Sequence, residues 1–157
     1  MQPYGPAVLR LAVGAVFVAH GGQKLFGLWG GPGLTGTASY FGQLGLAPAY
    51  PLAAAAAVAE FMGGLLLIAG ALTFYAALVL ALEMAIAAWK VHLSNGFFMN
   101  WALTPGHGHG YEFSLTLIGA LICLMLTGPG RFSFDGRRAR FAESEAYGRA
   151  RLRAGKM

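Results

Sequence analysis

An apolar run from Leu11 to Ala19 leads into His20-Gly21-Gly22-Gln23-Lys24-Leu25-Phe26-Gly27, the stretch that the rest of the chain has to accommodate. The run is too hydrophobic for an ordinary surface helix. If the helix continues through this stretch, His20, Gln23 and Lys24 fall at positions i, i+3 and i+4, on one face. Charge in hydrocarbon costs several kcal/mol, so a His and a Lys on one face of a membrane helix need partners or water.

The composition favours a membrane protein. Of 157 residues, 57% are apolar and only 11% are charged, which leaves too little polar surface to cover a soluble globule. Residues 1–130 have no net charge, and the whole excess of +5 lies in residues 131–157. We therefore predict two parts, a membrane domain over 1–130 and a basic tail over 131–157. Clustered arginines can bind nucleic acid, but on a membrane chain they favour a cytoplasmic anchor, and we predict no nucleic-acid partner.

Four apolar segments predict the fold. They cover about residues 7–28, 52–70, 72–92 and 111–127, each close to the ~20 residues that cross a bilayer. Arg10 lies near enough to the start of the first segment to extend to the interface. Gly70 allows a tight turn between the second and third segments, and a short interfacial helix is expected around 37–44. The prediction is an all-α, four-transmembrane-helix bundle with both termini in the cytoplasm, because the basic tail marks that side.

Ionisable residues on different segments share one depth. Counting ~1.5 Å per helical residue from the outer ends places three of them on the order of 12 Å deep. These three are His20, Glu60 and Glu83. Lys24 lies about one turn farther out, and Glu83 and Lys90 share a face at i and i+7. The outer end of this polar region is surrounded by Lys90, His92 and Glu112. The sequence thus predicts a polar pocket that opens to the outer face, above a dry floor.

Other interpretations of these residues stay open. Glu60 could simply hold helices together by a hydrogen bond to a Lys or His, while Gly63 and Gly64 let helix backbones approach. A haem between His20 and His92 is disfavoured, because the two differ in depth by roughly 12 Å. His107 and His109 lack further ligands nearby, so we predict no metal site. The lone cysteine excludes an intrachain disulfide or a thiolate metal cluster.

Several motifs, taken in order, resemble the DoxX family of small bacterial membrane proteins. They run from Leu9-Arg10-Leu11 and the His20–Gly27 stretch to Glu60-Phe61-Met62-Gly63-Gly64, and on through His92-Leu93-Ser94-Asn95-Gly96, Tyr111-Glu112 and Gly128-Pro129-Gly130-Arg131. The resemblance covers about residues 7–135. It implies a four-helix bundle in the bacterial inner membrane, in a family named for a subunit linked to quinone-dependent oxidation of sulfur compounds. The positions that match the family are His20, Gln23, Lys24, Glu60, Gly63, Gly64, His92 and Glu112, whereas Glu83 and Lys90 come from spacing alone.

The leading hypothesis is a subunit of a membrane oxidoreductase that binds quinone or quinol in the outer pocket. His20, Glu60 and Glu83 would carry the acid–base chemistry. The quinone would be held by Gln23, Lys24, Lys90, His92 and Glu112. No haem, flavin or iron–sulfur motif is visible, so a protein partner or a homo-oligomer is expected besides the bilayer. The alternatives are a small proton-coupled transporter and a scaffold that docks a soluble redox enzyme on its tail.

Overall fold

The structure is a computed structural model that describes residues 4–142 and 145, and its secondary structure is entirely helical within them. The all-α prediction is confirmed. Five α-helices are joined by short 3₁₀ and π segments. They are α1 (Gly5–Phe26), η1 (Leu28–Gly30), α2 (Gly33–Gln43), α3 (Ala49–Ala69), α4 (Thr73–Ala87), η2 (Ala88–His92), η3 (Leu93–Asn95) and α5 (Glu112–Thr127). A further helical segment covers residues 134–142. Residues 143–144 and 146–157 of the predicted basic tail lie outside the described residues.

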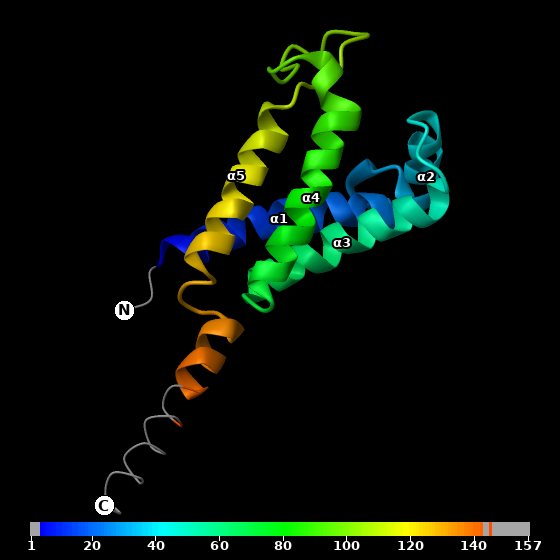
Figure 1. Cartoon of the computed structure of the whole chain (residues 1–157). Helices are drawn as coiled ribbons and strands as arrows, with labels where there is room; N and C mark the ends of the chain where they lie inside the picture. The colour runs from blue at the N-terminus through cyan, green and yellow to red at the C-terminus, as the bar shows by residue number, and fades with distance from the viewer. Residues whose placement is uncertain (1–3, 143–144, 146–157) are drawn as a thin grey trace, which may run out of the picture.

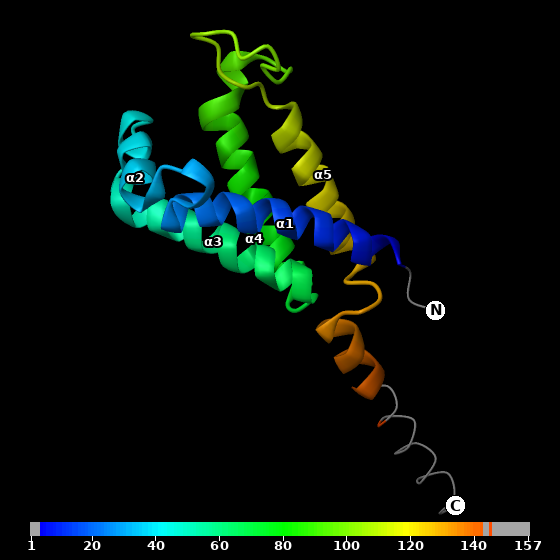
Figure 2. The same cartoon turned by 180° about the vertical axis from the view of Figure 1, so that it is seen from behind.

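The four long helices form two crossed pairs. Helix α1 packs along α3 and α4 packs along α5, and Figures 1 and 2 show the pairs crossing. The turn at Gly70 joins the pairs, and from there they diverge, so that α2 and the loop between α4 and α5 lie far apart (Figure 1). Gly70 adopts the left-handed conformation expected for this hairpin, with φ +66°. The short helix expected around 37–44 is present as α2 and packs on α3 and α1.

Small residues allow α1 and α3 to approach closely. A Cβ atom on Gly64 of α3 would lie 2.7 Å from the Gly14 carbonyl oxygen of α1, and a Cβ on Gly14 would lie 2.8 Å from the Gly64 carbonyl. Gly63 on the neighbouring face of α3 packs against Leu80 of α4. The glycines therefore determine how the helices meet, as small residues do at membrane helix interfaces.

The outer surface of the helices is apolar. Leu65, Leu82 and Leu126 are exposed, and α1, α3 and the segment Thr73–Asn95 are long and apolar enough to cross a membrane. Helix α5 is also apolar, but it has only 16 residues. Where the pairs cross, Phe17, Leu67, Leu80, Leu121 and other apolar residues form the core. Apolar surface both inside and outside is what a bilayer requires.

Arg10 does not extend to the interface as the sequence predicted. Its side chain is 1% exposed, and it lies among the ends of α3 and α5. The guanidinium donates five hydrogen bonds to backbone carbonyls, those of Leu67, Ile68, Pro129, Arg131 and Phe132, at 2.7 to 3.2 Å. All five N–H donors of an arginine are thereby used. The prediction was wrong because unpaired carbonyls at the end of a buried helix need a donor, and Arg10 reaches them before it reaches water.

Asp135 caps α4 from a distant part of the chain. Its carboxylate accepts hydrogen bonds from the amides of Leu72 and Thr73 and from the Thr73 hydroxyl, at 2.9 to 3.0 Å. Helix α4 has no cap from its own N-terminal residue. The Asp135 amide in turn donates to the Gly70 carbonyl. The start of the basic tail is thus docked onto the α3–α4 turn, and Arg10 and Asp135 together hold it there.

The substitution Asp135→Ala is expected to lower the free energy of unfolding by about 1–2 kcal/mol, because it removes the acceptors of the first α4 amides. Asp135→Asn keeps one side-chain oxygen and should cost less. Thermal unfolding of the detergent-solubilised protein, followed by circular dichroism, measures both. Equal melting temperatures for Asp135→Ala and the parent protein would show that the docked segment does not stabilise the helix.

Candidate functional site

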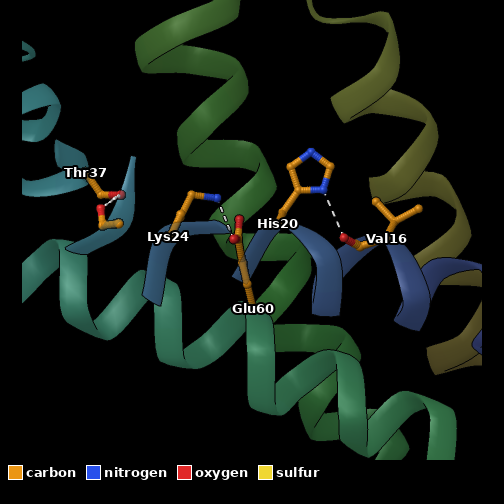
Figure 3. Close-up of polar contacts among 6 residues, drawn as sticks. Val16, His20, Lys24, Thr37 and Glu60 are labelled. Carbon is orange, nitrogen blue, oxygen red and sulfur yellow. Dashed lines mark hydrogen bonds and ion pairs between the residues drawn. The ribbon is translucent and has the colours of Figure 1, made fainter. Parts of the chain in front are cut away.

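A buried ion pair joins α1 and α3. Lys24 Nζ lies 2.5 Å from Glu60 Oε2, and the Glu60 side chain is 3% exposed (Figure 3). Gly21, less than one turn before Lys24, sets this geometry, because a Cβ there would collide with the backbone of Phe61. Since α1 and α3 touch backbone to backbone at that point, the side chains one position or one turn away meet directly. The sequence analysis singled out Gly63 and Gly64 but missed Gly14 and Gly21, although their i, i+7 spacing places them on one helix face.

Glu83 of α4 belongs to the same cluster. Its carboxyl group interacts electrostatically with Glu60 and Lys24. The contact between Gly63 and Leu80 lies one turn along α3 from Glu60 and one turn along α4 from Glu83, so it brings the two carboxyls to one level. Glu83 Oε2 is buried and has no hydrogen-bond partner within the described residues. A buried oxygen without a partner is uncommon, and it leaves this carboxyl group able to bind a further polar group.

His20 lies one turn before Lys24, on the same side of α1 (Figure 3). Its Nδ1 is 2.9 Å from the Val16 carbonyl oxygen. A carbonyl can only accept, so Nδ1 carries the hydrogen, and in the neutral ring Nε2 holds the lone pair. The side chain is exposed. His20 is therefore beside the cluster and not buried within it.

Gln23 lies near the end of α1. Its backbone carbonyl accepts the Gly27 amide that ends the helix. Its Cα and Cβ pack against Gly31 in the following turn, where a Cβ on the glycine would lie 2.5 Å from that of Gln23. Gln23 thus helps to fix the turn after α1.

The remaining predicted site residues lie elsewhere. His92 Nδ1 is 2.9 Å from the His109 carbonyl, and Glu112 Oε1 accepts the Met99 amide at 2.7 Å, so both hold the loop between α4 and α5. The Lys90 ammonium lies 4.3 Å from the centre of the Trp89 ring. Residues 88–92 form a π-helical turn. This turn changes the residue spacing, and the i, i+7 argument for a face shared by Glu83 and Lys90 assumed a continuous α-helix.

Figure 1 shows that this loop lies at the end of the α4–α5 pair farthest from α1 and α3. The structure therefore brings Lys24, Glu60 and Glu83 together, with His20 adjacent, and separates them from His92 and Glu112. Two shallow surface hollows flank the loop, of about 270 and 420 Å³. Within the described residues, no group of three His, Cys, Asp or Glu side chains is arranged to bind a metal.

Comparisons with known proteins identify a family and several relatives. The sequence profile of the DoxX family matches residues 5–93, a range that includes the whole Lys24–Glu60–Glu83 cluster. "Uncharacterized membrane protein Rv3486" of Mycobacterium tuberculosis is 34% identical over 138 residues, 85% of this chain and 81% of its own length. A Haemophilus influenzae protein named "Uncharacterized protein" is 27% identical over 87% of this chain and 92% of its own.

A third relative carries an activity in its name. "Putative oxidoreductase CatD" of Bacillus subtilis is 30% identical over 131 residues, 83% of this chain and 84% of its own length. No solved structure matches the chain significantly. The family profile and the relatives together show that the chain belongs to the DoxX family of membrane proteins.

Proposed function

We propose that this protein is the quinone-binding subunit of a membrane oxidoreductase, and that the quinone or quinol binds at Lys24, Glu60 and Glu83 with His20 beside them. The observation that carries the proposal is the buried Glu83 Oε2, which has no partner within the described residues although an ion pair lies next to it. The name of the CatD relative, an oxidoreductase, points in the same direction.

The donor and acceptor set fits a quinone head group. A quinol offers hydroxyl donors and a quinone offers carbonyl acceptors. Lys24 has three N–H donors and one is engaged by Glu60, so the others are available to a carbonyl oxygen. Glu83 Oε2 and His20 Nε2 can accept a hydroxyl hydrogen. The surrounding helix surfaces are apolar, as a quinone ring and tail require.

Each residue then has a distinct task. When bound, a quinone supplies a couple of two electrons and two protons. Lys24 orients the head group, and Glu60 keeps the ammonium in place through the 2.5 Å ion pair. Glu83 and His20 accept or return protons. Gln23 shapes the turn beside the site. Since the electrons need a second carrier, a protein partner is part of the proposal.

The apolar core beneath the cluster favours quinone binding over proton-coupled transport. Phe17, Leu67 and Leu80 lie between the cluster and the α3–α4 turn, and they belong to one apolar core. A transporter would need a polar path through this core. Flux in proteoliposomes that Glu60→Gln abolishes would support the transporter instead. We place the Arg-rich end of the protein in the cytoplasm and the cluster in the outer half of the bacterial inner membrane, in keeping with the positive-inside bias.

The substitution Glu83→Leu is expected to weaken binding of decylubiquinol about tenfold, because one hydrogen bond to a carboxyl group is worth about 1.4 kcal/mol. Binding can be measured as the ligand-dependent rise in melting temperature of the purified protein. Mass spectrometry of co-purified lipids should detect quinone with the parent protein and less with the variant.

The matched control is Glu112→Leu, the same change at a carboxyl group that holds the distant loop. It should leave decylubiquinol affinity unchanged. Absence of quinone from the purified protein, together with no response to added decylubiquinol or decylubiquinone, would refute the proposed function. An equal loss of affinity in both variants would show that binding does not occur at the cluster.

A further inference from the structure

The loop that joins η3 to α5, residues 96–111, has an apolar exposed surface. Trp101 is 81% exposed, Phe98 75% and Leu103 74%. No Asp, Glu, Lys or Arg occurs between Leu93 and Tyr111. A loop in bulk water usually exposes polar side chains and avoids a cluster of large apolar ones. The sequence analysis considered this loop only for a metal site at His107 and His109, and its exposed apolar side chains call for another environment.

The flanking helices differ in length, which bears on where the loop would lie in a bilayer. Thr73–Asn95 has 23 residues, which extend about 34 Å at ~1.5 Å per residue. Helix α5 has 16 residues and extends about 24 Å, less than the ~30 Å of hydrocarbon. The loop must therefore run from the end of the longer helical segment, at Asn95, back toward the bilayer to the start of the shorter α5, at Glu112. Its last residues would then lie at the edge of the hydrocarbon.

The backbone of the loop is paired where the chain would be deepest. The amides of Gly110, Tyr111 and Glu112 donate to the carbonyls of Phe98, Gly96 and Phe97, at 2.9 to 3.1 Å. Gly110 is buried against these carbonyls, and a Cβ on it would lie 2.5 Å from each. The Met99 amide is bound by Glu112. Polar backbone groups near hydrocarbon need such internal partners.

Two other backbone amides limit how deeply the loop can enter the hydrocarbon. Those of Phe98 and Ala102 have no acceptor in the part of the chain that the structure describes. In hydrocarbon each would cost several kcal/mol, whereas water and lipid head groups can satisfy them. The loop thus suits neither bulk water nor the hydrocarbon core. Trp89 and Phe113 in the adjoining helical segments are exposed as well.

We infer that residues 96–111 form a membrane-interfacial loop, whose partner is the head-group layer of the bilayer, with Phe98, Trp101 and Leu103 inserted among the lipids. Tryptophan and other aromatic residues favour this layer because they have an apolar body and a polar edge. Such a loop anchors the α4–α5 pair at its open end and offsets the short length of α5. This inference does not depend on what binds at Lys24.

A single-tryptophan variant tests the inference. The chain has three tryptophans, so Trp29→Phe with Trp89→Phe leaves Trp101 as the sole emitter. The full-length variant is reconstituted in phosphatidylcholine vesicles that contain lipids brominated at different acyl positions. We expect bromines nearest the head group to quench Trp101 by about half, and deeper bromines to quench it less, since the ring lies at the interface. Acrylamide in the water should quench it at least about threefold less than free tryptophan.

The control carries a tryptophan in the described part of the basic segment, Ala142→Trp, with all three native tryptophans replaced by phenylalanine. It should respond to acrylamide and not to brominated lipid. Strong acrylamide quenching of Trp101 without bromine quenching would overturn the inference and place the loop in water. Protection from both quenchers would overturn it as well, because a protein surface would then cover the loop.

A cysteine variant gives a second measurement if the tryptophan set folds poorly. In a Cys123→Ser background, Leu103→Cys should react with a membrane-impermeant maleimide at least about fivefold more slowly in vesicles than after detergent solubilisation, because lipid shields it. Equal rates in vesicles and detergent would contradict the interfacial position.

Discussion

Replacing Arg10 with alanine is expected to lower the free energy of unfolding by about 3–5 kcal/mol, the largest stability effect of any single substitution proposed for this protein. The guanidinium is 1% exposed and donates to five carbonyls from the end of α3 and the segment after α5. Its removal leaves these acceptors without donors in a water-poor setting, and each buried unpaired group costs about 1–3 kcal/mol before relaxation.

The expected shift in melting temperature is roughly 10 °C, at about 2–4 °C per kcal/mol for a chain of this size. Thermal unfolding of the detergent-solubilised protein measures it. Arg10→Lys should recover little, since an ammonium has three donors and cannot reproduce the planar fork of the guanidinium. Without the Arg10 hydrogen bonds, the segment after α5 should also detach from the α3–α4 turn. Proteolysis near residue 130 should then become faster.

Arg131→Ala is the matched control. The Arg131 side chain stacks on Tyr4 at 4.8 Å and is partly exposed, while only its backbone carbonyl accepts from Arg10. Its loss should cost no more than about 1 kcal/mol. If Arg10→Ala and Arg131→Ala had equally small effects, the five hydrogen bonds would contribute nothing to stability.

A double-mutant cycle on Lys24 and Glu60 is expected to show a coupling of at least about 2 kcal/mol. Lys24→Met alone leaves the Glu60 carboxylate, 3% exposed, without its cation, and should cost about 3 kcal/mol. Glu60→Leu alone leaves the ammonium unpaired and should cost a similar amount. The double variant removes both charges and should regain most of the loss, because two apolar groups of similar size can pack together.

Lys90→Met provides the control for the cycle. It is the same substitution at an exposed lysine that stacks on Trp89, and it should change stability by less than about 1 kcal/mol. Additive effects of Lys24→Met and Glu60→Leu would refute the coupling. The stable double variant then separates fold from function, since it should fold well yet fail to bind decylubiquinone at the cluster.

Much of the fold could be predicted from hydrophobicity and helix geometry. Apolar runs long enough for a bilayer marked the long helices, and Gly70 marked the hairpin between α3 and α4. Counting the helical rise placed His20, Glu60 and Glu83 at one level, with Lys24 about one turn farther out. In the structure Lys24 pairs with Glu60 and Glu83 interacts with both, whereas His20 is exposed beside them. Position along a helix was predictable because the rise per residue is nearly constant.

The partners of individual side chains could not be predicted in the same way. His92 and Glu112 were expected at the mouth of the cluster, but they hold the loop between α4 and α5. Their depth was estimated from regular helices, whereas a π-helical turn precedes His92 and the two helix pairs diverge. Neither feature has a periodic signal in the sequence. No sequence pattern indicated that Asp135 caps α4, because a cap supplied from a distant segment has no characteristic local spacing.

The sequence by itself determined that the chain is helical, that it belongs in a membrane, and on which helices its charged residues lie. Only the tertiary structure decided which of them meet. Rotation about a helix axis and the crossing of the two pairs depend on how backbones interlock, at Gly14 against Gly64 and at Gly21 against Phe61. These contacts are non-local. A shift of one residue in register there would turn Lys24 away from Glu60 without any change in hydrophobic pattern.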